Sequence, residues 1–291
     1  MADAVERIED LVLYEVVERH IARITLNRPE RRNAIQFPEM NDALRGAIAT
    51  AENDDDIKVV ILTGAGEHFC AGEDVRRTPV ETFGLQKGKR LPQSYRIRGI
   101  SQNLDGDFML SDKTVIAAVR GAALGLGFKI ALQCDLIVAA DDAKFGRPQT
   151  RIGLGGFDMY LPVLLLRLGI NRGYEALITG RTIPAEELER WGVLASVVPA
   201  DGLQDEALRY ARAVANHSTD GLMIGRKAIQ MFWEMMGWPQ WNTFVQVAHP
   251  LFTNLVWRED EANLYKELER TGSASAALKS VYRRWEDLGF D

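Results

Sequence analysis

Two glycine-containing segments carry the groups best placed to do chemistry, and in both the backbone would act. They are residues 68–74, with the sequence HFCAGED, and residues 121–127, with the sequence GAALGLG. Each follows a predicted strand and precedes a predicted helix, so helix-start N–H groups point outward and small residues admit a ligand. Two such donors on one oxygen would form an oxyanion hole, worth about 10² to 10³ in rate per donor. Taken alone, the spacing favours ordinary tight turns.

Other catalytic patterns are weak or missing. The second segment imitates a dinucleotide-binding unit, because Asp141 follows Gly121 by 20 positions, but its glycines do not form G-x-G-x-x-G. The sequence has no G-x-S-x-G elbow, H-E-x-x-H motif, phosphate-binding loop or paired cysteine spacing. Neither a metal site nor a serine triad is supported, and we expect no metal. The four histidines are scattered, at His20, His68, His217 and His249.

Hydrophobic spacing indicates which elements position these segments. Alternating side chains predict a half-buried strand at 21–26, and short apolar runs predict further strands at 59–62, 114–119, 135–140 and 193–198. Helical spacing predicts a helix opened by Pro38, and further helices near 93–110, 122–134, 157–168 and 184–191. The polar connection 76–113 either shapes a pocket or is a mobile loop.

From about Leu203 onward, strand signals stop and helical spacing dominates. We therefore predict an α/β core over residues 1–202 and a helical region over residues 203–291.

The composition is that of an ordinary globular protein. Of 291 residues, 46% are hydrophobic and 26% charged, with a net charge of -6, which excludes disordered, collagenous and disulfide-scaffold classes. The acidic balance argues against a nucleic-acid surface. The uncharged run 235–257 holds too many polar residues and prolines for a membrane span. Two cysteines in apolar stretches and an acidic N-terminus predict a cytoplasmic protein.

The two segments and their surroundings resemble the enoyl-CoA hydratase/isomerase (crotonase) family. The resemblance extends in order over about residues 10–200. Its matching stretches are ITLNRP at 24–29 with NA at 33–34, residues 59–64, FCAGED at 69–74, VIAAV at 115–119 with Gly121, CDLIVAA at 134–140, AKFGRP at 143–148 and TGR at 179–181.

The resemblance implies a crotonase-like spiral of β-β-α units, a homotrimer or dimer of trimers, and an acyl-CoA thioester as substrate. The helical region 203–291 would then complete the oligomer and cover the pocket. Coenzyme A would enter only as part of that substrate, with no separate cofactor. The backbone N–H groups of Glu73 and Leu126 would hold the thioester oxygen as it gains enolate charge. Backbone around Arg32, Ala34 and Ala71 would hold the nucleotide end. Further substrate contacts are implied at Asp74, Val75, Ala123, Gly125 and Pro148.

Two positions depart from the family pattern. Hydratases of the family carry one glutamate two positions after the glycine run and another directly after the proline of F-G-x-P, where this chain has Lys129 and Gln149. Gln149 cannot exchange protons near neutral pH, and Lys129 could do so only if burial substantially lowered its pKa. Because each acid/base group contributes about 10² to 10⁴ in rate, an ordinary two-glutamate hydratase is disfavoured.

Asp158 is a candidate replacement. It is the carboxylate of the turn 153–158, one residue beyond the place where related isomerases and dehalogenases carry an aspartate. Asp158 is either a base or nucleophile that faces Lys129 across the acyl pocket, or an ordinary first-turn acid of the next helix. The side chain of Glu73 is an alternative acid. Asp74 and Asp135 are expected to be structural, Asp135 as an anchor of the strand it begins.

The leading interpretation is an enzyme that forms an enolate in the Glu73/Leu126 hole and then isomerises, hydrolyses or cleaves a specialised acyl-CoA. An ordinary enoyl-CoA hydratase with relocated acid/base groups and a non-catalytic acyl-CoA binder are the alternatives. The helical region also holds aromatic residues that pack in the core and between subunits or, alternatively, cover a bulky acyl group. They are Phe232, Trp233, Trp238, Trp241, Phe244, Phe252, Trp257 and Tyr265.

Overall fold

The computed structural model describes residues 10–74, 106–153, 161–244, 258–261, 263–286 and 288–289. These residues belong to two compact units, each assembled from discontinuous segments. The first unit comprises Met1–Glu73, Gly106–Phe145 and Ile183–Gly237, and the second comprises Asp74–Asp105, Gly146–Thr182 and Trp238–Asp291. The predicted division after residue 202 coincides with the end of the last strand and the start of the C-terminal helices. Its role as a domain boundary stays a prediction.

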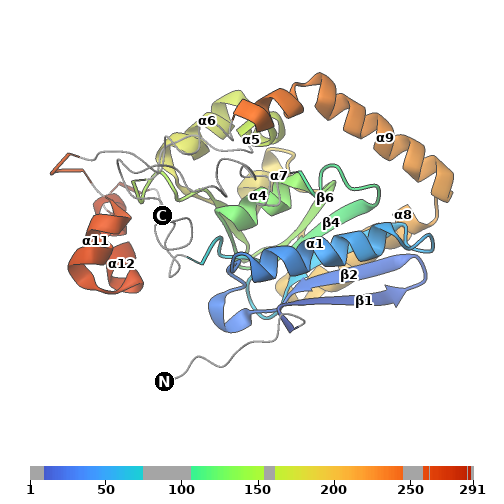
Figure 1. The fold of residues 1–291 in the computed structure, drawn as a ribbon, viewed down its shortest axis with the longest axis horizontal. Helices are drawn as coiled ribbons and strands as arrows, with labels where there is room; N and C mark the ends of the chain where they lie inside the picture. Colours follow the sequence, from blue (N-terminus) through green and yellow to red (C-terminus); the bar gives the residue numbers. More distant parts are fainter. Residues whose placement is uncertain are drawn as a thin grey trace. The chain divides into compact units, whose positions relative to one another are not determined.

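A six-stranded sheet forms the centre of the first unit (Figure 1). Its order is β1-β2-β3-β4-β6-β9; β1 pairs antiparallel with β2, and the other neighbours are parallel. The strand predictions are confirmed, with the last two shortened at their starts. The bounds are β1 Val12–Glu18, β2 Ile21–Leu26, β3 Val59–Gly64, β4 Thr114–Val119, β6 Leu136–Ala140 and β9 Ser196–Val198.

Helices cover this sheet. Helix α8 (Leu203–Ala215) packs on the face that Ile61 and Ile116 share. Helix α1 (Glu39–Glu52) contacts β1 and β2 and runs alongside them in Figure 1, with Pro38 at its N-cap as predicted. Burial on both faces explains why β3 and β4 are nearly continuous apolar runs rather than alternating ones.

The predicted helix near 122–134 is wrong in its first turn. Ala122–Leu124 forms the short strand β5, which belongs to a second sheet ordered β5-β7-β8, with β7 at Lys144–Gly146 and β8 at Thr182–Pro184. Gly125 follows with φ 54° and ψ -116°, outside the helical region, so helix α4 covers only Leu126–Gln133. Tertiary pairing of β5 has therefore overridden the local helical pattern.

Of the remaining helices, α5 and α7 agree with the helices predicted near 157–168 and 184–191, α6 was not predicted, and α9, α11 and α12 agree with the predicted helical region after residue 202. Their bounds are α5 Leu161–Leu168, α6 Ile170–Thr179, α7 Ala185–Arg190, α9 Thr219–Met235, α11 Leu264–Thr271 and α12 Ala274–Glu286. The helix predicted near 93–110 is wrong over its described part, since residues 106–110 form turns; the rest lies outside the described residues. No helix in the described ranges is long and apolar enough to cross a membrane.

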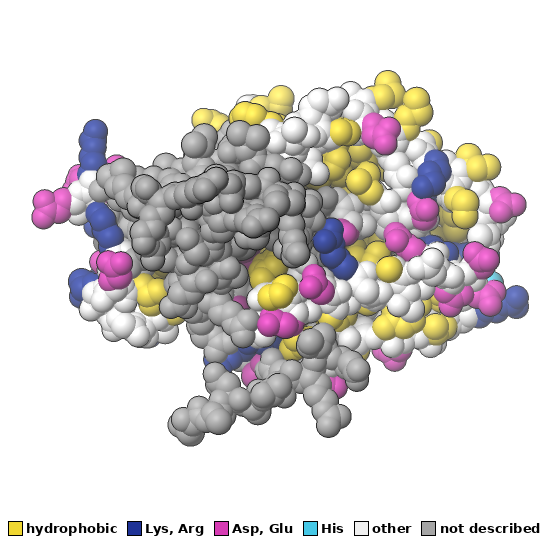
Figure 2. Space-filling model, viewed as in Figure 1, with side chains coloured by type: hydrophobic (Ala, Val, Ile, Leu, Met, Phe, Trp, Pro, Cys, Tyr) yellow, Lys and Arg dark blue, Asp and Glu magenta, His cyan; other side chains and the backbone are white. Residues whose placement is uncertain are grey.

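Charged side chains of both signs are interspersed over the described residues of the face in Figure 2. Hydrophobic side chains gather along α9, where Ile224, Met231, Phe232 and Met235 are all exposed. Trp233 on the same helix is buried, so α9 contacts the unit along a narrow line.

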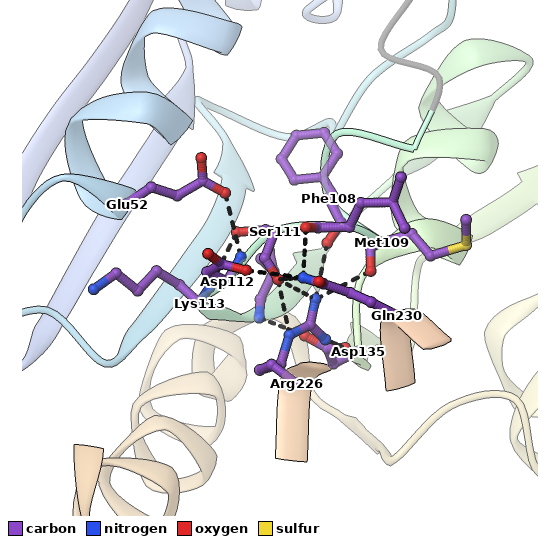
Figure 3. A network of polar contacts seen from close by, with 11 residues as sticks. Glu52, Phe108, Met109, Ser111, Asp112, Lys113, Asp135, Arg226 and Gln230 are labelled. Atoms are coloured by element: carbon purple, nitrogen blue, oxygen red, sulfur yellow. Dashed lines mark hydrogen bonds and ion pairs between the residues drawn. The ribbon is translucent and has the colours of Figure 1, made fainter. Parts of the chain in front are cut away.

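A buried arginine fixes that line of contact (Figure 3). The Arg226 side chain on α9 pairs with the Asp135 carboxylate and donates to the backbone oxygens of Ser111, at 2.6 and 2.9 Å, and of Met109, at 3.1 Å. The other carboxylate oxygen of Asp135 accepts the Val115 N–H at 2.7 Å. The expected structural role of Asp135 is therefore confirmed, since it joins β4, the start of β6 and α9.

Arg226→Ala should lower the free energy of unfolding by about 3 to 5 kcal/mol, because it leaves a largely buried carboxylate and several carbonyls without their partner. Urea denaturation measures this change. Lys227→Ala is the matched control: the neighbouring Lys227–Asp112 pair is exposed, with 56% and 44% of its side chains accessible, so its loss should cost less than about 1 kcal/mol. Equal losses in the two variants would contradict this assignment.

Candidate active site

The first glycine-containing turn is held against an earlier loop of the same unit. The Ala71 N–H donates to the Arg32 carbonyl at 2.9 Å, and the Ile35 N–H donates to the Gly72 carbonyl at 2.7 Å. Ile35 and Glu73 form an isolated parallel bridge. The loop around Arg32 and Ala34, predicted to hold the nucleotide end of the substrate, therefore lies directly beside the predicted donor Glu73.

The second turn lies on the other side of the first. The Cys70 N–H donates to the Ala122 carbonyl at 2.8 Å, and the Cys70 carbonyl accepts the Leu124 N–H at 3.0 Å. One residue earlier, the Phe69 N–H donates to the Arg120 carbonyl at 2.8 Å. Segments 69–73 and 120–126 thus run side by side, which is the arrangement that two converging backbone donors require.

Glycines permit this close approach. A Cβ atom on Gly127 would lie 2.2 Å from the Cys70 carbonyl oxygen, so no side chain fits there. Gly72 has φ +103°, and a Cβ on it would lie 3.6 Å from the Leu126 backbone nitrogen. Glu73 is the next residue, and Leu126 is the first of α4, whose opening N–H groups have no acceptor within the helix. The two predicted donors are therefore brought together.

Asn33 locks the earlier loop in place, a role that sequence reasoning missed. It is fully buried and has φ 54°, a conformation that asparagine adopts more readily than most residues. Its Oδ1 accepts the Arg28 N–H at 2.8 Å, and its Nδ2 donates to the carbonyls of Ala65 and His68, at 2.9 and 2.6 Å. The sequence offered one signal for this role: Asn33 is a polar residue inside a stretch that matches the family.

Lys129 lies on α4, which is buried along its whole length, and only 4% of Lys129 is exposed. Gln149 belongs to the second unit; its Oε1 is shielded from solvent and accepts no hydrogen bond from the described residues. Ala123 is buried in β5 and Gly125 caps α4, whereas Pro148 is half-buried. Val75 and Asp158 lie outside the described residues, so their predicted roles stay predictions.

Both cysteines are buried free thiols. Burial raises the pKa of the Cys70 thiol to about 12, which keeps it protonated at neutral pH. Cys70 therefore contributes its backbone and a small apolar side chain rather than a nucleophile. Within the described parts of the chain, no cluster of three or more histidine, cysteine or acidic residues could hold a metal ion.

Buried arginines hold the loop of the second unit that carries Gln149. Arg147 Nη1 donates to Thr150 Oγ1 at 3.3 Å, and Arg151 Nε donates to the Thr179 carbonyl at 3.0 Å. The Arg151 guanidinium also stacks on Trp285, 5.2 Å from the ring centre. Backbone pairing of Leu264 with Ile152 at 3.0 Å attaches the last two helices to the same loop.

The aromatic residues of the helical region have mixed environments. Trp233 and Trp238 are buried, as core packing requires, whereas Phe232 and Phe244 are about half exposed. Phe232 contacts Trp233 edge-on, with ring centres 5.6 Å apart. The side chains of Phe252, Trp257 and Tyr265 lie outside the described residues, and the predicted lid stays a prediction.

A family profile described as "Enoyl-CoA hydratase/isomerase" matches residues 17–255. The chain belongs to the enoyl-CoA hydratase/isomerase family. A mevalonyl-coenzyme A hydratase of Beauveria bassiana is 37% identical over 279 residues, which cover 92% of each chain. A probable enoyl-CoA hydratase of Mycobacterium bovis is 36% identical over 223 residues, covering 75% of this chain and 76% of that relative.

The fold prediction is confirmed by solved structures of the family. A crystal structure of an enoyl-CoA hydratase/isomerase from Xanthobacter autotrophicus Py2 has a TM-score of 0.78 at 29% identity, covering 94% of this chain and 98% of that one. The chain is therefore a crotonase-fold member of an enzyme family that acts on acyl-CoA thioesters.

Gly127→Ala should displace the two turns, because the added methyl group collides with the Cys70 carbonyl. We expect a loss of about 1 to 3 kcal/mol in unfolding free energy, with weakened acyl-CoA binding. Calorimetry measures both. In the control Gly46→Ala, on the exposed side of α1, the new Cβ meets nothing within 4 Å, so stability should rise by about 0.5 to 1 kcal/mol. Unchanged binding in Gly127→Ala would contradict the predicted close fit.

Proposed function

We propose that this protein is an acyl-CoA enzyme that stabilises a thioester enolate with the backbone N–H groups of Glu73 and Leu126. The observation that carries the proposal is the hydrogen-bonded pairing of Cys70 with Ala122 and Leu124, which sets the two donor turns side by side. Negative charge that develops on the thioester oxygen would be stabilised there by donors already in place, without reorganisation.

The position of Leu126 adds to this effect. It begins α4, and the partial positive charge at a helix N-terminus favours an anion within the first turn. Since α4 is buried, this attraction is weakly screened by water. Leu126 in place of a glycine leaves the donor intact, because the donor belongs to the backbone.

The nucleotide end of coenzyme A would bind along residues 32–34 and Ala71. The hydrogen bond from the Ala71 N–H to the Arg32 carbonyl joins this loop to the donor turn. Binding of the nucleotide and placement of the thioester would then be mechanically linked. Coenzyme A would act as part of the substrate, with no separate cofactor, and the active protein would be a homotrimer or dimer of trimers.

The reaction after enolate formation is set by the departures from the family pattern. With Lys129 and Gln149 at the two glutamate positions, the chain would isomerise, hydrolyse or cleave a specialised acyl-CoA. Asp158 would act as base or nucleophile, and Lys129 would stabilise its charge or donate a proton. Lys129 is buried on α4, the helix that begins with the proposed donor Leu126, and this position supports its proposed role.

Hydration or dehydration with relocated acid/base groups is the second candidate. It is favoured by the names of the relatives, above all the mevalonyl-coenzyme A hydratase that matches along 92% of the chain. The substrate would then be a 3-hydroxyacyl-CoA or the corresponding enoyl-CoA. A binder without catalysis is the third candidate.

A titration calorimeter and a turnover screen separate these candidates when applied to the same panel of enoyl-, 3-hydroxyacyl- and 3-ketoacyl-CoA thioesters. Isomerised, hydrolysed or cleaved product supports the first candidate, and water addition or loss supports the second. Affinity without product for any thioester would leave only the binder.

Lys129→Met and Asp158→Asn should each lower kcat by at least about 10², with acyl-CoA affinity retained, because each removes a group from the chemical step rather than from binding. Steady-state kinetics and calorimetry on the thioester that is turned over measure the two quantities. Lys144→Met is the matched control, because Lys144 is the exposed residue of β7, and it should keep the wild-type rate. Full rates in both variants would refute the assigned roles.

A further inference from the structure

A histidine side chain joins the two donor turns. His68 is the first residue of the first turn, and its Nδ1 accepts the backbone N–H of Ala122 at 3.1 Å. Ala122 begins β5, only four residues before the donor Leu126. The imidazole thus acts as an acceptor where the rest of the contact between the turns is made by backbone groups.

The surroundings leave His68 little freedom. Its carbonyl accepts the Asn33 Nδ2–H at 2.6 Å, which fixes the backbone from the earlier loop. On the other side lies Gly121, with φ +55°, where an added Cβ would be 2.4 Å from His68 Nδ1. The ring edge therefore packs directly against the backbone of the second turn.

This hydrogen bond requires one protonation state. A ring nitrogen that accepts an N–H must itself carry no proton, so His68 is neutral with its proton on Nε2. Protonation at Nδ1 would place two donors against each other. The bond to Ala122 would then be lost, although its neighbour remains: Gly121 N–H donates separately to Asp142 Oδ1 at 3.1 Å.

The charges around the ring favour the neutral form. Arg32 on the earlier loop and Arg120 beside the second turn oppose a positive imidazole, whereas Glu67 and Asp142 favour it. Burial and then Arg32 are the largest effects, and together they lower the pKa of His68. The unfolded chain consequently binds this proton more tightly, so the free energy of unfolding falls as the pH drops below about 6.5.

We propose that His68 is a positioning residue for the second backbone donor: its neutral imidazole holds Ala122, and through it the Leu126 N–H, whereas its protonation releases them. The catalytic consequence rests on the proposed function, since it requires an oxyanion at Leu126. The hydrogen bond itself and its loss at low pH do not.

Two variants separate the hydrogen bond from the mere presence of a side chain. In His68→Asn the amide oxygen takes the place of Nδ1 and accepts without titrating, whereas His68→Leu has no acceptor. The probe is acetoacetyl-CoA, whose enolate absorbs in the near ultraviolet and reports on charge held by the donors. Titration of the probe itself is common to all three proteins and cancels in the comparison.

As His68 becomes protonated, we expect the affinity of the wild-type protein for the enolate to fall about five-fold relative to that of His68→Asn. A change of about five-fold corresponds to the loss of one ordinary hydrogen bond. His68→Leu should bind about five-fold more weakly than His68→Asn at every pH. Identical pH profiles for the wild-type protein and His68→Asn would overturn the proposal.

Nuclear magnetic resonance of protein labelled with ¹⁵N tests whether the Ala122 N–H donates to His68 Nδ1, and it does so without any substrate. We expect His68 in the Nε2–H tautomer at neutral pH, with an Ala122 amide shift that titrates together with the ring and does not titrate in His68→Asn. An Nδ1–H tautomer, or an Ala122 amide indifferent to the ring, would overturn the proposal. If acetoacetyl-CoA binds to no protein at any pH, the proposed function fails, and these spectra still decide the role of His68.

Discussion

The close contact between two backbone segments is the constraint on which the rest of the site depends. Cys70 donates to Ala122 and accepts from Leu124, so the segments cannot separate without breaking both bonds. Strands β3 and β4 are parallel neighbours, and parallel strands end at the same edge of a sheet, which is where the two turns begin. Gly127 completes the contact because its missing side chain leaves room for the Cys70 carbonyl.

Polar side chains then fix this backbone geometry from outside. Asn33 ties the nucleotide loop to residues 65–68, and His68 ties those residues to Ala122. Asp135 plays the same part at the far end of α4, where it anchors β6 to Arg226. Each ordinary hydrogen bond contributes only about 0.5 to 1.5 kcal/mol, so the geometry is maintained by their combination rather than by any single bond.

Much of this arrangement follows from the sequence, because the strands are clear apolar runs and the turn residues are small. The local pattern failed at Ala122–Leu124, where pairing with β7 in a second sheet overrides helical spacing. The sequence also offered no reason to single out His68 among its four scattered histidines. The acceptor role of this ring depends on Gly121 lying against it, and no spacing rule reports a contact across 54 residues. Asp158 and Val75 lie outside the described residues, and their assignment still rests on resemblance.

A crystal structure of the protein with bound acetoacetyl-CoA tests the central claim most directly. The account predicts that the thioester oxygen lies about 2.7 to 3.1 Å from the backbone nitrogens of both Glu73 and Leu126. It also predicts that the nucleotide lies along residues 32–34. A thioester oxygen held by side chains, or by only one of the two nitrogens, would contradict the proposed backbone oxyanion hole.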